Sequence, residues 1–529
     1  MEYIVSAKEM KTADRNTSEI YGLSPEVLME RAALAVADFL SQEWKDKAAA
    51  AGRDTPCVLV FAGSGGNGGD GIAVARILHQ RGARVLLVTV GEIGKYHEIA
   101  QKQLDTAMRY DVPMICLRQA KETEAVRMLT ERRFDYLVDA LFGIGLTRPL
   151  TGVHSAAVAL INSLRETERD SLLVVSIDLP SGINTDTGEI CGIAVQADVT
   201  ITMNYKKRGM VLFPGAKAAG RIVTADVGIT PESFQDEKPE LVAFTEEPGK
   251  LLPPRPDASH KGSFGKLLII AGNGSIGGAA ILSARGALSA GVGMVRVFTE
   301  KKNRTALLQA LPEALIDTWD EALPAERMDD TLDAAISWAN ACVIGPGIGT
   351  GESARRMLMR VLSENRLPLV IDADGCNLIA ADPSVREAVK AYRPMEGWPV
   401  LTPHRGEFAR LTGIRAAEGE SVILSAPLKL ARELSCTVLC KDARSVTARA
   451  DCTQQVINLS GNNGMATAGS GDVLAGIVGA LAAQGMNSME AASVGSHLHG
   501  LAGDRAAARF GKAAMTAGDI VTGLKEIGI

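Results

Sequence analysis

The sequence predicts two consecutive α/β domains, each built on a doubly wound parallel sheet. The chain of 529 residues is too long for one ordinary hydrophobic core. Short β-rich runs alternate with helical stretches, which is the order typical of a parallel sheet covered by helices. Between residues 230 and 258 the apolar periodicity lapses and prolines gather, which indicates a linker between a first domain, 1–232, and a second, 233–529.

The first domain contains a glycine-rich turn between a strand and a helix. Strands are predicted at 57–61, 85–90, 136–138, 172–177 and 199–203, and a helix at 72–81. Gly63, Gly65 and Gly68 fit the pattern G-x-G-x-x-G, which in this position predicts a Rossmann-like nucleotide-binding turn. Asp70 argues against a plain dehydrogenase, because a carboxylate at a helix entrance would oppose a pyrophosphate.

Two further segments of the first domain follow apolar strands. The first, 139–146, reads Asp-Ala-Leu-Phe-Gly-Ile-Gly-Leu, and the second, 176–182, reads Ser-Ile-Asp-Leu-Pro-Ser-Gly. Either segment alone is typical of turn chemistry, since Asp, Pro, Ser and Gly are the usual turn formers. Their combination with the glycine-rich turn favours a special site.

The second domain repeats the alternation with other motifs. Strands are predicted at 266–271, 294–298, 341–344, 369–372 and 438–440. Segments 272–280, 345–349, 372–374 and 401–407 each lie beyond a strand, where open α/β sheets bind ligands. Taken singly, His404 is typical of a structural histidine and Asp372 of a capping residue. Together these segments predict a ligand site.

Residues 461–473, Gly-Asn-Asn-Gly-Met-Ala-Thr-Ala-Gly-Ser-Gly-Asp-Val, lead into an apolar helix predicted at 473–481. Glycines let backbone N–H groups close on an oxyanion, and the helix N-terminus adds a partial positive charge. We expect Gly469, Ser470 and Gly471 to face a phosphate while Asp472 serves as base at the acceptor hydroxyl. The alternative is a capped helix, since Ser and Asp are good N-caps.

Composition limits the partners and the compartment. The net charge is −6 without a basic stripe, so nucleic acid is not expected and small molecules are the default substrates. The chain lacks a signal-like N-terminus and any stretch of 18 apolar residues, so no membrane association is expected. The eight cysteines show no C-x-x-C spacing, which predicts reduced thiols and a cytoplasmic location.

The second half, about residues 245–529, resembles the ADP/ATP-dependent NAD(P)H-hydrate dehydratases of the ribokinase-like fold. The resemblance rests on HKG at 260–262, GPG-x-G at 345–349, DAD at 372–374, TPH-x-GE at 402–407 and MAT-x-GSGD at 465–472. Ala468 and Ser470 depart from the family pattern, but both are small. The family's reaction phosphorylates the hydroxyl of a hydrated nicotinamide ring and then eliminates phosphate, with a divalent metal, Mg²⁺, bridging the nucleotide phosphates.

The resemblance also implies residue roles in the second half. Asp472 is the base at the hydroxyl. The hydrated dinucleotide is expected to contact Ala279, Gly347, His404 and Asp472. The adenine nucleotide is expected to contact Lys441, Asp442, Ala443, Arg444, Ser445 and Gly471.

The first half, about residues 1–230, resembles the NAD(P)H-hydrate epimerase domain through its three polar segments and Leu-Met-Glu-Arg-Ala at 28–32. The resemblance implies that Asp178 is the acid/base, oriented or balanced by Lys206. The oxygens of Asn67, Asp139 and Ser181 would hold K⁺. The hydrated cofactor is expected to contact Asp178 and Gly66, Asn67, Gly68, Gly69, Asp70, Gly143, Ile144, Gly145, Leu146, Thr147, Arg148 and Pro149. Gly66 stands where the family usually has asparagine, which predicts weaker substrate contact.

The combined prediction is a bifunctional nicotinamide-nucleotide repair enzyme that epimerises the R and S hydrates of NADH and NADPH and dehydrates the S form using ADP or ATP. The family resemblance also implies a homo-oligomer. Two alternatives remain open: a ribokinase-like kinase for a small molecule such as a vitamin precursor, with an N-terminal nucleotide-binding module, and an N-terminal half that only binds nucleotides or partners.

Overall fold

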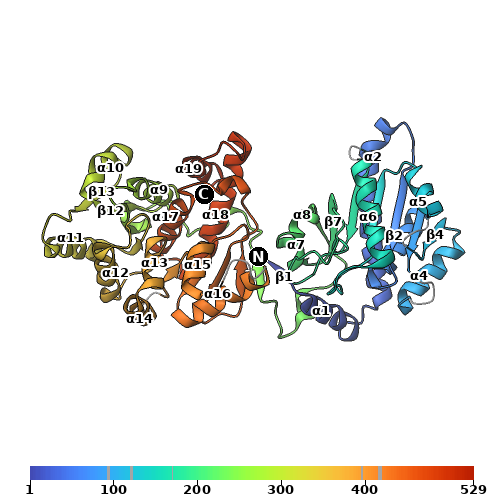
Figure 1. The fold of residues 1–529 in the computed structure, drawn as a ribbon, viewed down its shortest axis with the longest axis horizontal. Coiled ribbons are helices and arrows are strands. Elements are labelled where there is room, and N and C mark those ends of the chain that lie inside the picture. Colours follow the sequence, from blue (N-terminus) through green and yellow to red (C-terminus); the bar gives the residue numbers. More distant parts are fainter. Residues whose placement is uncertain (92–95, 120–122, 169–170, 395–396, 415–419) are drawn as a thin grey trace. The chain divides into compact units, whose positions relative to one another are not determined.

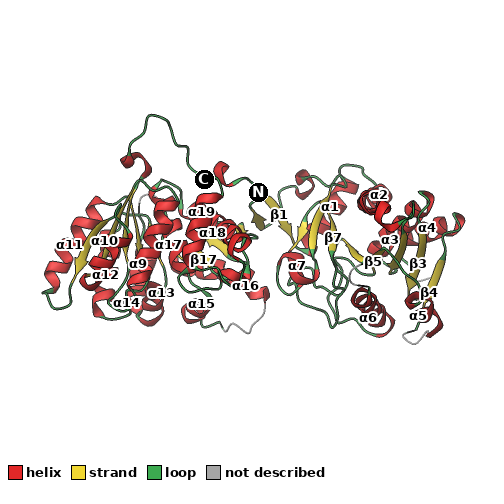
Figure 2. Ribbon diagram, turned by 90° about the horizontal axis from the view of Figure 1, so that it is seen from above, coloured by secondary structure: helices red, strands yellow, loops and turns green. Residues whose placement is uncertain are grey.

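The computed structural model describes residues 1–529 except 92–95, 120–122, 169–170, 395–396 and 415–419. The chain forms two compact units, residues 3–240 and residues 241–529 together with 1–2. In each unit, helices cover both faces of a sheet (Figures 1 and 2). The predicted class of two α/β sheets is therefore confirmed.

The N-terminal unit is built on a parallel sheet in the order β4-β3-β2-β5-β6-β7-β9. The order reverses between β2 and β5, which is the switch point where such sheets bind ligands. The strands are β2 (Cys57–Ala62), β3 (Arg84–Val90), β4 (Met114–Leu117), β5 (Tyr136–Ala140), β6 (Leu173–Ile177), β7 (Val199–Met203) and β9 (Arg221–Ala225). The main helices are α1 (Ala7–Glu19), α2 (Pro25–Ala51), α3 (Gly66–Gln80), α4 (Glu98–Arg109), α5 (Thr123–Thr130) and α6 (Gly152–Thr167). The short β1 (Glu2–Val5) pairs with β8 (Lys206–Lys207), and α7 (Arg208–Val211) and α8 (Gly215–Ala218) follow.

Alternation along β2 separates the two apolar layers of this unit. Val58 and Val60 pack into the cluster that contains α1, α2 and α3, whereas Leu59 and Phe61 pack into the cluster that contains α6. Successive side chains of a strand point to opposite faces, so this strand supports both layers.

Helix α3 begins at Gly66 rather than at residue 72 as predicted. The glycines in its first turns are therefore helical instead of forming a loop. A Cβ at Gly68 would lie 1.9 Å from the Gly63 carbonyl oxygen, and one at Gly71 would lie 2.4 Å from Ala140 Cβ. The glycines thus allow the helix to approach the strand ends closely.

The C-terminal unit has the strand order β13-β12-β11-β14-β15-β16-β17-β18-β19-β10. The pairs from β13 through β17 are parallel, and β18 runs antiparallel to β17 and β19. The order reverses between β11 and β14. The strands are β10 (Leu241–Ala243), β11 (Lys266–Ile270), β12 (Met294–Glu300), β13 (Leu315–Trp319), β14 (Ala341–Ile344), β15 (Leu369–Ile371), β16 (Val400–Leu401), β17 (Thr437–Cys440), β18 (Val446–Arg449) and β19 (Gln455–Ile457). The helices are α9 (Gly277–Ser289), α10 (Arg304–Ala310), α11 (Ala325–Trp338), α12 (Glu352–Glu364), α13 (Asp374–Ala381), α14 (Pro383–Ala391), α15 (Arg405–Thr412), α16 (Glu420–Leu434), α17 (Ser470–Ala483), α18 (Ser488–Phe510) and α19 (Ala517–Glu526).

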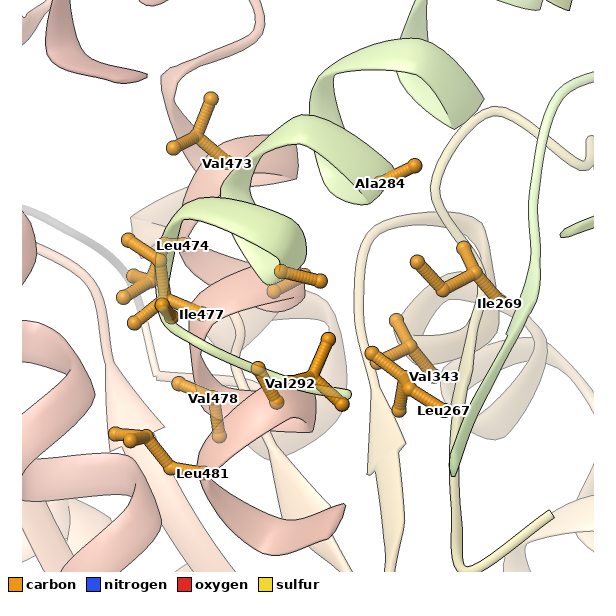
Figure 3. Packing of buried hydrophobic residues seen from close by; sticks show 14 of the residues in the cluster. Leu267, Ile269, Ala284, Val292, Val343, Val473, Leu474, Ile477, Val478 and Leu481 are labelled. Carbon is orange, nitrogen blue, oxygen red and sulfur yellow. The ribbon is translucent and has the colours of Figure 1, made fainter. Parts of the chain in front are cut away.

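Helices α9 and α17 pack backbone to backbone against each other. A Cβ at Gly476 would lie 1.9 Å from the Ser283 carbonyl oxygen, and one at Gly286 would lie 2.5 Å from that of Val473. Ile477 and its neighbours fill the space around this contact (Figure 3). The first turn of α17 is thereby held in a fixed position relative to α9.

Part of the expected linker is folded into the N-terminal unit. Pro231–Phe234 forms a 3₁₀ turn in which Ser233 and Phe234 are buried. Asn16 Nδ2 of α1 donates to the Ser233 carbonyl at 2.8 Å. This segment is folded because Ser233 and Phe234 are buried, although its proline content predicted a linker.

Two expectations from composition concern membranes and thiols. Within the described ranges, no helix combines the length and apolar composition that a bilayer span requires. All eight cysteines are free thiols, four of them buried and four half-buried. Burial raises the pKa of Cys376 well above its ordinary value.

Candidate active sites

The glycine-rich turn after β2 leaves the N-terminus of α3 open. Gly65 is the N-cap and provides no side-chain cap, so the first N–H groups of the helix remain available to a ligand. A Cβ at Gly66 would meet no atom within 4 Å. Aligned N–H groups at a helix start suit an anion. Nucleotide binding at this turn stays a prediction.

Asp178 lies just after β6 with φ of 66°. Its Oδ1 accepts hydrogen bonds from Lys207 Nζ and, at 3.2 Å each, from Thr202 Oγ1 and Met203 N. Lys207 is fully buried and also donates to Thr202 Oγ1 at 2.8 Å and to the Met203 carbonyl at 3.1 Å. The sequence interpretation assigned this role to Lys206 and was wrong by one residue, because consecutive strand residues point to opposite faces.

Two more carboxylates share the electrostatic field of Asp178. Burial raises the pKa of Asp70 well above its ordinary value, and the charges of Asp178 and Asp14 raise it further. Burial, then Asp178, raises the pKa of Asp14 to about 6, partly offset by Lys207. The cluster therefore holds a proton more readily than separate carboxylates would. Asp14 was missed because it lies on α1 without any recognisable motif.

Asp139, at the end of β5, holds the segment that contains Ser181. Its Oδ1 accepts from Ser181 Oγ at 2.6 Å and Leu141 N at 3.3 Å, and its Oδ2 accepts from Ser176 Oγ at 2.8 Å and Ser181 N at 2.9 Å. Burial raises the pKa of Asp139 although these hydrogen bonds oppose the shift. Phe142 N donates to Ser181 Oγ at 2.9 Å. Two of the predicted polar segments are thus tied together.

Asn67 is the third predicted oxygen donor. Both polar atoms of its side chain are buried without a hydrogen-bond partner among the described residues. A Cβ at Gly143 would lie 3.3 Å from Asn67 Cβ, so the loop after β5 passes directly beside this amide. A buried unsatisfied amide is costly, and a bound ligand or ion would satisfy it.

The predicted substrate loop 143–149 mixes structural and exposed positions. Leu146 is buried in the apolar cluster, so its backbone alone is available to a ligand, and Ile144 packs partly against the core. Gly145, Thr147, Arg148 and Pro149 are exposed. These contacts to a hydrated cofactor stay a prediction.

The Leu-Met-Glu-Arg-Ala segment anchors α2. Glu30 forms an ion pair with Arg76 of α3 at 2.6 Å, and Arg31 donates to the Val227 carbonyl at 3.2 Å. Met29 packs closely on Gly69, where an added Cβ would lie 2.6 Å from Met29 Cε. This motif therefore positions α3 and the turn at its start.

In the C-terminal unit, α17 also begins without a side-chain cap. Gly469 is the N-cap with φ of 84°, and neither Ser470 nor Asp472 caps the helix. The capped-helix interpretation is therefore wrong. Ser470 Oγ instead lies 3.3 Å from Nε2 of His499, a buried α18 residue that sequence reasoning missed because nothing local links the two.

Asp472 lies in the first turn of α17 among other carboxylates. Burial raises its pKa to about 6, with Asp372, Asp374 and Glu407 adding to the shift and Lys441 opposing it. A carboxylate with this pKa is largely ionised at neutral pH and can still accept a proton from a reacting hydroxyl.

Lys441 lies between the carboxylates and the glycine turn. Its Nζ donates to Asp372 Oδ1 at 2.6 Å, and the same oxygen accepts from Thr402 Oγ1 at 2.7 Å. A Cβ at Gly471 would lie 3.2 Å from Lys441 Nζ. Burial lowers the pKa of Lys441, but Asp372 and Glu407 outweigh it and the pKa is raised. This ammonium group is thus positioned beside the expected phosphate site.

The predicted nucleotide segment, from Lys441 to Ser445, is the connection between β17 and β18. Arg405 pairs with Asp442, whose Oδ1 accepts from Ala443 N at 2.7 Å. Arg444 donates to the Leu459 carbonyl at 3.3 Å, and burial lowers its pKa. These side chains stabilise the connection.

The loop 345–349 brings two predicted dinucleotide contacts together. A Cβ at Gly347, which has φ of 62°, would lie 3.1 Å from Ala279 Cβ at the start of α9. Gly349 N donates to Asp374 Oδ2 at 2.8 Å, which ties the loop to the DAD segment. The three motifs therefore border one site.

His404 caps α15. Its Nδ1 accepts from Gly406 N at 2.9 Å, its backbone N donates to Glu407 Oε2 at 2.9 Å, and Nε2 lies 3.1 Å from Glu407 Oε1. The imidazole is 55% exposed. His404 therefore has the structural role that a lone histidine predicts, and its contact with substrate stays a prediction.

Across the described residues, no group of three or more His, Cys, Asp and Glu side chains is arranged to hold a metal ion. Any ion at the N-terminal site would therefore rely on amide, hydroxyl and backbone oxygens as well as Asp139.

Comparison with known proteins covers almost the whole chain. The NAD(P)H-hydrate dehydratase family model matches residues 267–525, and that of the YjeF-related protein N-terminus matches residues 25–209. The bifunctional NAD(P)H-hydrate repair enzyme of Thermofilum pendens is 35% identical over 97% of this chain and 94% of its own length. Those of Moorella thermoacetica and Escherichia coli are 35% and 32% identical, each over 98% of this chain and at least 93% of their own lengths.

A solved ADP/ATP-dependent NAD(P)H-hydrate dehydratase from Bacillus subtilis, co-crystallised with ATP and Mg²⁺, is 26% identical and covers 52% of this chain and 93% of its own, with a TM-score of 0.45. Sequence identity over both units, at 30% or more with relatives of the same length, establishes the relationship. The chain belongs to the family of bifunctional NAD(P)H-hydrate repair enzymes.

Proposed function

We propose that this chain repairs hydrated NADH and NADPH in two steps. Domain 1–232 interconverts the R and S hydrates, and domain 233–529 dehydrates the S hydrate at the expense of ADP or ATP. The observation that carries the proposal is the position of Asp472 in the first turn of α17, a helix that begins at Gly469 without a side-chain cap and has Lys441 beside it. The chain that contains this site matches a bifunctional repair enzyme over 97% of its length. Spontaneous hydration gives both epimers, so the two activities complement each other.

In the dehydratase, Asp472 removes the proton from the ring hydroxyl while that oxygen attacks the terminal phosphorus of the nucleotide. The bond from phosphorus to the nucleotide's bridging oxygen breaks, and the hydroxyl becomes a phosphate ester. The ester C–O bond then breaks and the neighbouring ring carbon gives up a proton to phosphate or solvent, which forms the ring double bond, releases inorganic phosphate and restores the dihydronicotinamide. The backbone N–H groups of Gly469 and Gly471 and the Lys441 ammonium stabilise the transferred phosphoryl group.

Mg²⁺ would neutralise charge on the nucleotide phosphates. Mg²⁺ usually keeps several waters and takes one or two carboxylates plus substrate oxygens. Asp372 already accepts from Lys441 and Thr402, so it is a poor ligand. The chain's own described residues do not form a dedicated Mg²⁺ site, and the ion would enter with the nucleotide.

In the epimerase, Asp178 shuttles one proton as the ring hydroxyl leaves and returns on the other face, or as the ring opens and closes. Lys207 fixes the carboxylate orientation through Oδ1 and leaves Oδ2 available to the ligand. Asp70 and Asp14, both with raised pKa, can keep the proton within the cluster. The open N-terminus of α3 would bind the pyrophosphate, because burial raises the pKa of Asp70 and so favours its uncharged form, which does not repel phosphate.

The unpaired Asn67 side chain fits a K⁺ ion, because amide oxygens and one carboxylate suit a monovalent cation. Ser181 Oγ lies 3.3 Å from the Phe142 carbonyl, which adds a backbone oxygen to the same region. Asp139 already accepts four hydrogen bonds, so coordination would replace the longest, from Leu141 N. K⁺ would there supply positive charge near the cofactor phosphates. Equal epimerisation rates in K⁺ and Li⁺ buffers would remove this ion from the proposal.

The partners that we propose are small molecules: the hydrates of NADH and NADPH and the nucleotide. Free thiols support the expected cytoplasmic compartment, where cysteines stay reduced. Self-association of one or both halves stays a prediction from the family.

The full chain would be incubated with an R/S mixture of NADH hydrate, Mg²⁺, K⁺ and either ADP or ATP. Absorbance of the dihydronicotinamide and free phosphate would be followed together. Complete conversion with one phosphate released per NADH supports both activities and identifies the donor.

Other outcomes separate the alternatives. Conversion that stops at the initial S fraction contradicts the epimerase and directs attention to Gly66. A stable phosphorylated product without NADH favours the small-molecule kinase.

A further inference from the structure

A cleft of about 310 Å³ lies in the C-terminal unit where β12 and β13 end. Its lining includes Asn273, Gly274, Glu300, Lys302, Trp319 and Glu321. Ligand pockets span roughly 300–1,000 Å³, so this cleft can hold part of a dinucleotide but not all of it.

The cleft shares a wall with the site of the proposed dehydration. Gly349 lines the cleft and donates to Asp374, and Asn273 N donates to the Gly347 carbonyl at 2.7 Å. Gly347, which lies beside Ala279, therefore adjoins the cleft, and Asp374, whose charge acts on Asp472, adjoins it as well. A ligand whose nicotinamide end reaches Asp472 can extend its other end into the cleft.

The cleft also lies where dinucleotide-binding folds hold a ribose, relative to their strands and helix. The turn after β11 leads through α9 into β12, and Glu300 is the last residue of that second strand. In βαβ dinucleotide-binding units, an acidic residue at this place accepts a hydrogen bond from the ribose 2′-hydroxyl. Glu300 is 13% exposed and accepts from Gly274 N, so its carboxylate is held beside the turn.

The charges around the cleft are mostly negative. Lys302 Nζ pairs with Glu300 at 2.9 Å, and that contact is the main reason why the pKa of Lys302 is raised. Glu321 adds a second carboxylate, whose Oε1 lies 3.5 Å from Ser353 Oγ. One lysine beside two glutamates leaves a net negative cleft, which disfavours a further phosphate.

We infer that this cleft binds the adenosine half of the hydrated dinucleotide and selects a free 2′-hydroxyl, so that the dehydratase prefers hydrated NADH to hydrated NADPH. The inference rests on the proposed function of this unit. A 2′-hydroxyl donates to Glu300, whereas a 2′-phosphate has no proton to donate there near neutral pH and meets two carboxylates.

The test compares kcat and KM for the S hydrates of NADH and NADPH with the full chain and saturating nucleotide. We expect kcat/KM to be about tenfold higher for hydrated NADH. The difference should lie in KM and not in kcat, because the cleft is remote from the reacting bond and binds the substrate equally in the ground state and the transition state. The double variant Glu300→Gln with Glu321→Gln removes both charges, and the new amide oxygen at position 300 can still accept from Gly274 N. Its preference should fall to about twofold.

The matched control is Glu313→Gln, an exposed glutamate that precedes β13 at the end opposite Trp319. It should keep the full preference. Equal kcat/KM for the two hydrates, or a preference for hydrated NADPH, would overturn the inference while the dehydratase stands. Failure of the chain to convert either hydrate would overturn the proposed function itself. Should the double variant misfold, the exposed Glu321→Gln change alone must narrow the preference.

Discussion

The two units place a lysine and an aspartate beside an open helix start, yet the two lysines are held differently. Lys207 is 0% exposed and is tied to Asp178, Thr202 and the Met203 carbonyl. Lys441 is 16% exposed, and within the described part of the chain its Nζ has Asp372 as its hydrogen-bond partner.

This is the difference expected between a fixed counter-ion and a ligand-binding group. The three Lys207 protons are all engaged, so that ammonium can orient Asp178 but has no proton left for a substrate. Lys441 has protons left, and its Nζ lies 3.2 Å from where a Cβ on Gly471 would be. We therefore expect Lys207 to orient Asp178 and Lys441 to bind phosphate.

The largest expected effect is at Asp472. Asp472→Asn should lower dehydration of the S hydrate by about 10³-fold, because the reacting hydroxyl loses its base, while nucleotide binding changes little. Turnover is measured with purified S hydrate, and nucleotide affinity by calorimetry. Asp451→Asn, an exposed position, is the control. Near-normal turnover would remove Asp472 from its role.

Asp178→Asn should lower epimerisation by about 10²-fold and leave dehydration of the S hydrate unchanged. Asparagine tolerates the positive φ at this position and its Oδ1 can still accept from Lys207, so we expect the variant to fold, which its Tm checks. Exchange between R and S hydrates is followed by chromatography. Unchanged exchange would favour an N-terminal half that only binds.

Lys207→Met and Lys441→Met test the comparison directly. Each should cost about 3 kcal/mol of unfolding free energy, because each leaves a buried carboxylate without its cation. Lys441→Met should in addition weaken nucleotide binding by about 10–100-fold, the loss of a charged hydrogen bond. The rise of Tm with added nucleotide should persist in Lys207→Met and largely vanish in Lys441→Met. An equal response in both would break the distinction.

The pH dependence of the dehydratase should reflect Asp472. Its pKa is raised to about 6, so the carboxylate is protonated below that pH and cannot act as base. For the S hydrate, kcat/KM should decline below pH 6 and be about tenfold lower at pH 5 than near pH 7. Nucleotide affinity measured over the same range serves as the control. A flat profile down to pH 5 would contradict this role.

The smallest expected effect is at Gly66. Gly66→Asn should raise epimerase kcat/KM by about 2–5-fold, because the open space there admits an amide that can form one neutral hydrogen bond with the substrate. Gly52→Asn is the matched control, since a Cβ at this helix end also meets no atom within 4 Å and asparagine tolerates its φ of 64°. If both variants behave alike, Gly66 is not a substrate contact.

The sheets could be predicted because buried parallel strands are nearly continuous apolar runs. The predicted strand at 199–203 and the observed β7 have the same limits. The start of α3 could not be predicted, because glycine usually opposes helix formation and the close approach to Gly63 that requires it is a tertiary contact.

The candidate sites could be predicted where their residues lie in recognisable motifs, directly after a strand for Asp178 and at the start of an apolar helix for Asp472. Asp14 and His499 were missed because they belong to helices that are distant in sequence from the motifs of these sites. Lys207 was missed for a local reason: two adjacent lysines look equivalent until the strand direction fixes which one points inward.

The contact between α9 and α17 bears on how the dehydratase half can diverge. Main-chain atoms at Ser283 and Gly476 set the spacing of these helices, so exchanges of apolar side chains in the surrounding core leave it nearly unaltered. Ala279 lies in α9 and Asp472 lies in α17, so the fixed spacing of the helices also fixes the distance between these two residues. We therefore expect new substrate preferences to arise in the cleft, at positions such as Glu300 and Glu321, which lie outside this helix contact.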